Sequence, residues 1–202
     1  MVELSQVVAD FAQGMISADA HAPQAVNVRS GEPFQPGLGP HTENQTTELV
    51  IKEIRMFSEY SYSKQIALEV PYPKMPRSKC DLCIGDPDSW EWVIEIKMMR
   101  LMGDNGKPND NILMHILSPY PAHRSAVTDC RKLLDSGLSG QKAILIYGYD
   151  YDQWPMEPAI SAFEVLASRE VWLSTRCSAK VTGLIHPVHQ RGEVYGWEIR
   201  PK

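Results

Sequence analysis

The sequence contains no run of about 18 or more apolar residues, the length that a membrane-spanning helix needs. Its start also lacks a basic stretch followed by an apolar one, so we expect neither a secretory signal nor a membrane anchor. Only four cysteines occur among 202 residues, too few and too scattered for a disulfide framework. We therefore expect a cytoplasmic protein with reduced thiols.

Positive charge is also in short supply. The chain has 20 lysines and arginines against 25 acidic residues, a formal net charge of -5. The stretch from residue 71 to 107 contains as many acidic as basic side chains. A protein that binds nucleic acid without sequence preference usually shows a basic face, and the linear sequence indicates none. If nucleic acid is the substrate, we expect a homodimer or a partner subunit to help deliver it.

The composition is otherwise that of an ordinary globular protein, with 43% hydrophobic and 22% charged residues. The length suits one domain, which we expect to have three parts. These are an N-terminal helix and arm (1–41), a core (42–150) and a C-terminal elaboration (151–202). The arm, residues 19–41, contains four prolines and little periodicity, which is typical of a loop.

Hydrophobic periodicity and turn residues predict helices and strands in turn. Helices are expected at 3–18, 42–60, 124–136 and 159–167, and strands at 65–70, 79–84, 90–98, 142–149, 180–188 and 193–200. Thr42 with Gln45 three residues later is typical of a capping box, and Gly137 of a helix end. From residue 42 the order is helix, three strands, helix and strand. This order predicts an α/β fold in which an antiparallel hairpin joins a central crossover strand, 142–149, buried on both faces.

The strand at 90–98 separates two sets of side chains, because alternate residues of a strand point to opposite faces. One face is wholly apolar and is expected in the core: Trp92, Ile94, Ile96 and Met98. The other face contains Val93, Glu95 and Lys97. An acid and a lysine are therefore expected on one surface of this strand.

The preceding strand brings a second acid to Glu95. Residues 85–89 are rich in turn formers and predict a hairpin. If residues 86–90 form its loop, Gly85 pairs with Glu91 and Asp81 lies opposite Glu95. Opposed side chains have Cβ atoms about 4.5–5.5 Å apart, so two carboxylates there repel each other unless a cation lies between them. A divalent metal with oxygen ligands meets that need, whereas a loop one residue different would offset the pair.

The stretch KCDLCIGDPDSWEWVIEIKMMR, residues 79–100, resembles the core of the PD-(D/E)XK phosphodiesterase superfamily. That superfamily has an Asp on one strand and an acid-x-Lys on the next, here Asp81 and Glu95-Ile96-Lys97. Its element order also matches residues 42–150. The resemblance therefore implies a restriction-endonuclease-like fold, a mixed sheet flanked by helices. The chain departs from the literal motif because Lys79-Cys80 precedes Asp81 where a proline would be expected.

The resemblance implies a magnesium-dependent nuclease, with manganese able to substitute. DNA is the expected substrate, and RNA stays open as the alternative. The implied metal ligands are Glu43, Asp81, Glu95 and the carbonyl of Ile96. Glu43 is expected because it lies on the inward stripe near the start of the first core helix, and Glu48 is the second choice. Asp81, Glu95 and Lys97 are the implied catalytic residues, and Lys97 would orient or activate the attacking water.

Two alternatives remain open at this point. An inactive nuclease-like domain would bind nucleic acid or a partner protein without cutting it, and a related phosphoesterase would act on a nucleotide. The surroundings of Lys97 distinguish catalysis from binding. An open cleft that Lys97 shares with Asp81 and Glu95 favours catalysis, whereas a salt bridge that seals Lys97 from solvent favours binding.

The helix at 124–136 supplies further polar residues. Arg124 is a candidate phosphate-binding residue, because helix N-termini attract anions. We expect Asp129 and Lys132 on the exposed face of this helix.

Five other residues have competing interpretations. Cys80 and Cys83 are three apart on a strand, so they are expected on opposite faces as buried small side chains rather than as joint metal ligands. His186 and His189 have no acidic partner nearby in the sequence and are expected as surface or packing residues. Trp90 could stack on a base or cover the end of the hairpin.

Overall fold

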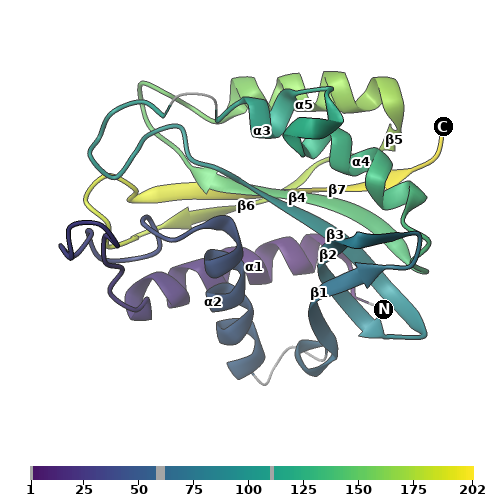
Figure 1. Cartoon of the computed structure of the whole chain (residues 1–202), viewed down its shortest axis with the longest axis horizontal. Helices are drawn as coiled ribbons and strands as arrows, with labels where there is room; N and C mark the ends of the chain where they lie inside the picture. Colours follow the sequence, from purple (N-terminus) through teal and green to yellow (C-terminus); the bar gives the residue numbers. More distant parts are fainter. Residues whose placement is uncertain (1, 58–61, 110–111) are drawn as a thin grey trace.

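The computed structural model describes residues 2–57, 62–109 and 112–202. Its architecture is α/β, with a mixed seven-stranded sheet between two layers of helices (Figure 1). The helices are α1 (Leu4–His21), α2 (Glu43–Met56), α3 (Met114–Leu117), α4 (Ala126–Asp135) and α5 (Glu157–Glu170), with 3-10 turns η1 (Ser63–Gln65) and η2 (Pro121–His123). The strands are β1 (Ile66–Tyr72), β2 (Met75–Asp86), β3 (Ser89–Met99), β4 (Gln141–Tyr149), β5 (Trp172–Leu173), β6 (Cys177–Thr182) and β7 (Arg191–Arg200).

The strand order is β1-β2-β3-β4-β7-β5, and β6 also pairs with β7. β3 and β4 are parallel, and the other pairs of strands are antiparallel. Because parallel neighbours need a crossover, the chain passes through α3 and α4 between β3 and β4. The predicted order of helix, three strands, helix and strand is confirmed, with the short α3 added.

Different helices cover the two faces of the sheet (Figure 1). α1 and α2 pack on one face, and α3, α4 and α5 pack on the other. β4 contributes Leu145 to the core under α1 and Ile146 to the core under α4, and both are fully buried. The predicted burial of this strand on both faces is therefore confirmed.

The N-terminal helix is part of the main core. α1 is longer than predicted and extends to His21. The ring of Phe11 is fully buried and lies 5.4 Å from the ring of Tyr147 on β4. A Cβ on Gly14 would lie 3.0 Å from Val50 on α2, so the two helices pack closely here.

Capping chemistry sets the starts of the core helices. The predicted capping box at α2 is present, with Thr42 and Gln45 bonding each other's backbone groups. α2 ends at Met56, and the predicted end at Tyr60 lies outside the described residues. α4 begins at Ala126, two residues later than predicted, because the side chain of Ser125 accepts the Thr128 amide as its N-cap.

The first two strands extend beyond the predicted ranges, 65–70 and 79–84. β1 continues to Tyr72, and Pro71 pairs with Lys79. β1 is an edge strand, where a proline need not break a ladder of hydrogen bonds. β1 pairs with β2 from Ile66 to Tyr72, with a shift in register between Pro71 and Tyr72, and β2 continues to Asp86 in its hairpin with β3.

The predicted strand at 180–188 is wrong in its second half. β6 ends at Thr182, and Gly183 then adopts a φ of 76°, a left-handed conformation that ends the strand. Residues 183–190 form a loop instead, and this loop contains both His186 and His189.

The cysteines and the helices bear on the expected environment of the chain. All four cysteines are free thiols. In the described parts of the chain, no helix has the length and apolar character that a membrane crossing requires.

Replacement of Phe11 by alanine should lower the free energy of unfolding by about 3–5 kcal/mol, because it opens a cavity between α1 and β4. Chemical denaturation measures this change. The matched control is Val28→Ala, since Val28 is fully exposed and its truncation should change stability by less than about 0.5 kcal/mol. Equal stability of the two variants would mean that α1 is not part of the cooperative core.

Candidate active site

The pairing of β2 with β3 sets the geometry of the site. Leu82 pairs with Ile94 and Ile84 with Trp92, which is the predicted register. Continued by one residue, it places Asp81 opposite Glu95. The predicted turn is wrong, because Gly85 pairs with Trp90 rather than Glu91. A bulge between Ile84 and Gly85 absorbs the difference, and Gly85 adopts a φ of 117° there.

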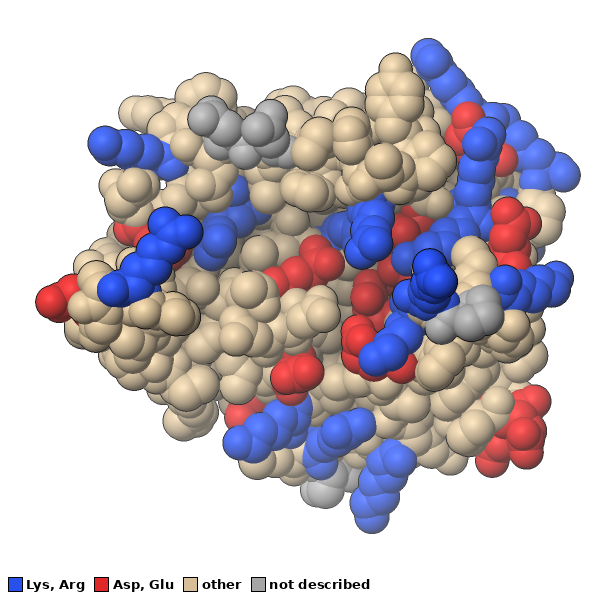
Figure 2. All heavy atoms as spheres, viewed as in Figure 1, with Lys and Arg blue, Asp and Glu red and all other residues tan. Residues whose placement is uncertain are grey.

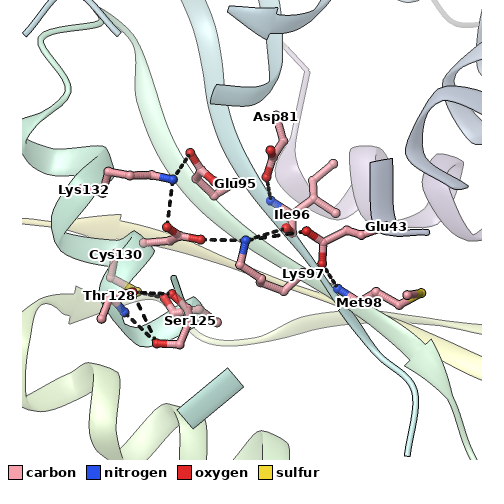
Figure 3. A network of polar contacts seen from close by, with 12 residues as sticks. Glu43, Asp81, Glu95, Ile96, Lys97, Met98, Ser125, Thr128, Cys130 and Lys132 are labelled. Atoms are coloured by element: carbon pink, nitrogen blue, oxygen red, sulfur yellow. Dashed lines mark hydrogen bonds and ion pairs between the residues drawn. The ribbon is translucent and has the colours of Figure 1, made fainter. Parts of the chain in front are cut away.

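Asp81 replaces a backbone partner where the hairpin opens. Its Oδ2 accepts a hydrogen bond from the Ile96 amide at 2.7 Å. This side-chain bond ties β2 to β3 beyond the regular pairs, so the carboxylate of Asp81 is held beside that of Glu95 (Figure 3). The predicted faces of β3 are also confirmed. Trp92, Ile94 and Ile96 are buried in the core under α1 and α2, and Met98 packs against it.

Glu43 reaches the same place from the start of α2. Its Oε2 accepts a hydrogen bond from the Met98 amide at 2.5 Å, and its Oε1 lies 3.7 Å from Nζ of Lys97. Glu48, the second choice from the sequence, is exposed and does not line the cavity over β3, although it lines a small adjoining pocket with Glu43 and Asp81. The structure therefore brings Glu43 and not Glu48 to the β3 residues.

α4 contributes two charged side chains, Asp129 and Lys132, that were expected on its exposed face. Asp129 is buried, 2% exposed, and its two oxygens each lie 2.8 Å from an ammonium nitrogen, one of Lys97 and one of Lys132. Lys132 also lies 2.9 Å from Oε1 of Glu95. The expectation is wrong because Asp129 lies on the inward stripe of α4, three residues after Ala126 and four before Leu133. The polar Asp129 on an otherwise apolar stripe was the sequence signal for its burial.

The buried charges in this group do not balance. Glu43, Asp81, Glu95 and Asp129 face two lysines, so two negative charges remain when all six groups are ionised. Burial raises the pKa of Glu95 well above its usual range, and the charges of Asp81 and Asp129 raise it further. Burial also raises the pKa of Asp81 and of Glu43, against the opposing effect of Lys97. The site therefore favours the arrival of a cation.

The lysines stay charged in spite of their burial. Burial opposes the charge of Lys97, but the carboxylates of Asp129 and Glu43 outweigh it and raise its pKa. Lys132 behaves in the same way, with Glu95 and Asp129 as its partners. Nζ of Lys97 also donates to the Ile96 carbonyl at 3.2 Å. Both ammonium groups are therefore fixed donors on the wall of the site.

A cavity of about 1040 Å³ opens over the network. Five basic side chains line it from β2 and from the segment that leads into and forms α4: Arg77, Lys79, Arg124, Arg131 and Lys132. In Figure 2, acidic side chains lie together in a hollow right of the centre, and basic side chains surround them. The fold thus gathers a basic rim, defined by these five residues, that the balanced linear sequence did not indicate.

Two residues with strained backbones belong to the lining of this cavity. Glu69 and Arg124 have φ angles of 55° and 48°, and they are the non-glycine residues with positive φ in the described chain. Such conformations are costly and tend to persist at functional sites. Arg124, the predicted phosphate-binding residue, is exposed just ahead of α4 and lines the cavity.

The cysteine and tryptophan expectations are settled by burial. Cys80 and Cys83 are both buried in the core under α4, so the prediction of opposite faces is wrong. Burial raises the pKa of Cys80, and Cys83 beside it raises that pKa further, so this thiol stays protonated. Trp90 is buried as well and covers the end of the hairpin rather than presenting a ring for stacking.

A second polar cluster lies beyond the C-terminal end of β3. Oδ1 of Asp104 lies 3.0 Å from Nε2 of His189 and 3.7 Å from Nε2 of His186, and both histidines are fully buried. The expectation that these histidines pack in the interior is confirmed, and the expectation that they lie on the surface is wrong. A Cβ on Gly39 would lie 2.5 and 2.6 Å from the two rings, so the arm can pass here only as glycine.

The spacing of Asp104, His186 and His189 would suit a metal ion. Their ligand atoms lie within 4.8 Å of one another, and no carboxylate trio in the described part of the cavity is as close. However, Nδ1 of His186 accepts the amides of Val188 and His189, at 3.1 and 3.2 Å. The hydrogen of the neutral ring is therefore on Nε2, which makes that atom a donor and not a ligand. Arg100 already balances Asp104, so we assign this cluster a structural role.

Comparison with known proteins adds no further assignment. The sequence matches no family model, no curated protein and no solved structure. The function is therefore argued from the geometry and charge of the site.

Stability should depend on the buried His186 at mildly acidic pH. Burial and the neighbouring His189 lower the pKa of His186 to about 4. The unfolded chain, with an ordinary histidine pKa of about 6.5, binds this proton first, so stability is full above pH 6.5 and falls as the pH drops toward 4. His186→Asn should keep the turn, because an Asn oxygen accepts amides in the same way, and should lose about 2 kcal/mol of this pH dependence.

Denaturation of both proteins at pH 7 and pH 4.5 measures the difference. The comparison cancels the titration of the carboxylates that both proteins share. Parallel pH profiles would show that His186 is not held neutral in the folded chain.

Proposed function

We propose that the chain is a magnesium-dependent nuclease of the PD-(D/E)XK kind, which hydrolyses phosphodiester bonds in nucleic acid, with DNA as the first substrate to test. One observation supports this most. Asp81, Glu95 and Lys97 come from adjacent strands in the order of the motif and line one cavity. The arrangement of α2, β1, β2, β3, α4 and β4 is the restriction-endonuclease-like core in this proposal.

The donor set fits a magnesium ion. Asp81 and Glu95 would hold it together with the carbonyl of Ile96, and all three are the hard oxygen donors that magnesium prefers. Glu43, which comes from the start of α2, would complete the site or hold a second ion. The two unbalanced negative charges of the site correspond to one divalent cation. When bound, the metal ion would lower the pKa of a water and neutralise charge that develops on the phosphate.

The residues of the chain have distinct tasks in this proposal. Lys97 donates from the cavity wall to the attacking water or to the phosphate oxygen that gains charge. Lys132 and the hydroxyl of Tyr72 both contact Oε1 of Glu95, which fixes the orientation of that carboxylate. Proton transfer and charge stabilisation thus depend on donors that are already in position before substrate arrives.

The basic rim suits a strand with several phosphates. Lys79 and Arg131 have acidic neighbours, Glu69 and Glu170, at the edge of the cavity. For Arg77 and Arg124 the described residues supply no ion pair, so these two guanidinium groups are available to phosphate. Phosphate contacts of this kind position a strand over the site without reading its sequence.

A second candidate function follows from the surroundings of Lys97. Its side chain is 12% exposed and lies 2.8 Å from Asp129, and a sealed lysine favours a domain that binds nucleic acid without cutting it. The first proposal is preferred because Lys97 still lines the cavity together with Asp81 and Glu95.

Removal of the Glu95 carboxylate or of the Lys97 ammonium should greatly slow cleavage. Glu95→Gln and Lys97→Met should each lower the cleavage rate by at least about 100-fold, because one removes a metal ligand and the other the donor to the reaction. Assays would use supercoiled plasmid, linear duplex, single-stranded DNA and RNA with magnesium or manganese, and EDTA should stop the reaction.

The matched control is Asp135→Asn, an exposed acid on α4 that does not line the cavity, which should cleave like the wild type. Nucleic-acid binding without cleavage under every condition would support the second candidate. If neither binding nor cleavage occurs, both are wrong.

Arg124 should contribute binding rather than chemistry. In the Glu95→Gln background, which prevents cleavage, Arg124→Ala should weaken oligonucleotide binding about three- to tenfold and lower the salt slope by about 1, as expected for one lost phosphate contact. Fluorescence anisotropy across a salt series measures both. Arg29→Ala, an equivalent change on the exposed arm, should alter neither. An unchanged slope would remove Arg124 from the phosphate contacts.

A further inference from the structure

Lys97 has anionic neighbours on two sides of the cavity. Asp129 on α4 lies 2.8 Å from its Nζ, and Glu43 on α2 lies 3.7 Å away on the other side. The shorter contact fixes the ammonium toward α4 (Figure 3). The carboxylates of Asp81 and Glu95 lie beside the same lysine and also act on its pKa.

Stability alone does not account for a buried ion pair at this position. Asp129 is a charged residue on the apolar stripe of α4, and its burial carries a desolvation cost. Apolar residues of similar volume often replace buried ion pairs without loss of stability. The ion pair of Asp129 with Lys97 fixes the position of the ammonium, which an apolar contact would not do.

The position matters because Lys97 competes with a metal ion for the same carboxylates. Without Asp129, the nearest anions to the ammonium would be Glu43, Asp81 and Glu95, the residues proposed to hold the ion. A lysine that turned toward them would supply their counter-charge itself. Asp129 gives that lysine another partner.

We infer that Asp129 is a positioning residue that holds Lys97 against α4 and so keeps its ammonium from taking the place of a divalent cation at the carboxylates of Asp81 and Glu95. This inference rests on the proposed function. Asp129 does not act as a ligand, because one of its oxygens contacts Lys97 and the other contacts Lys132. Its effect on the metal ion passes through the lysine.

A double-mutant cycle separates this role from a simple effect of charge. Magnesium and manganese binding would be measured by calorimetry, without nucleic acid, for the wild type, Asp129→Asn, Lys97→Met and the double variant. Asp129→Asn should weaken metal binding about tenfold when Lys97 is present, and less than about twofold in the Lys97→Met background. Asp129→Glu, which keeps the charge, should restore part of the affinity.

The control is Asp135→Asn, the same substitution at an exposed position of α4, which should leave metal affinity unchanged. Thermal unfolding checks that each variant is folded, and Asp129→Glu serves in place of Asp129→Asn if the latter does not fold, with an expected loss smaller than tenfold that again disappears in the Lys97→Met background. In cleavage assays at saturating metal, Asp129→Asn should lower kcat and leave KM for nucleic acid unchanged, because the lysine and not the rim is displaced.

Three results would overturn the inference. An equal loss of affinity in both backgrounds would mean that Asp129 acts by its charge alone. Unchanged affinity of Asp129→Asn, with Glu95-dependent metal binding in the wild type, would refute the inference and leave the proposed function standing. A wild-type protein that binds no divalent cation would overturn both.

Discussion

The burial of the Glu95 carboxylate is the constraint around which the site is built. The residue is 1% exposed, and a charged or protonated carboxyl at that depth needs polar partners. They come from three elements: the hydroxyl of Tyr72 from β1, the ammonium of Lys132 from α4 and the neighbouring Asp81 from β2. The hairpin and the helix layer must therefore be placed correctly relative to β3 before Glu95 is satisfied. This dependence makes the cavity wall rigid where chemistry would occur.

Features fixed by local geometry could be predicted from the sequence. The alternation along β3 identified its apolar face, because a strand has only two faces and one of them is wholly apolar. The pairing of Asp81 with Glu95 was predicted from a turn that is wrong by one residue. The bulge at Gly85 restored the register, since a slip would have moved Ile94 and Trp92 out of the core. Burial of one face thus determined the register more strongly than the turn.

Features fixed by contacts between distant segments could not be predicted. Asp129 is of a residue type that is usually exposed, and only the packing of α4 on β3 brings it to Lys97. The same holds for Asp104, which is 85 residues from the histidine that it bonds. The basic rim combines arginines from β2 and from the start of α4, and acidic residues between them in sequence conceal it. Net charge therefore says little about one cavity.

The ion pair of Lys97 with Asp129 is compatible with opposite functions, and its depth decides between them. A lysine whose ammonium is enclosed on every side has no free donor for substrate. An ammonium has three donors. One of those of Lys97 bonds the Ile96 carbonyl, and the ion pair with Asp129 lies on a second side. Lys97 also lines the cavity, so its third donor can reach a bound water or phosphate. The salt bridge and the carbonyl contact together fix two directions of the ammonium and so orient its third donor. In the proposed function, the ion pair with Asp129 therefore orients Lys97 and does not disable it.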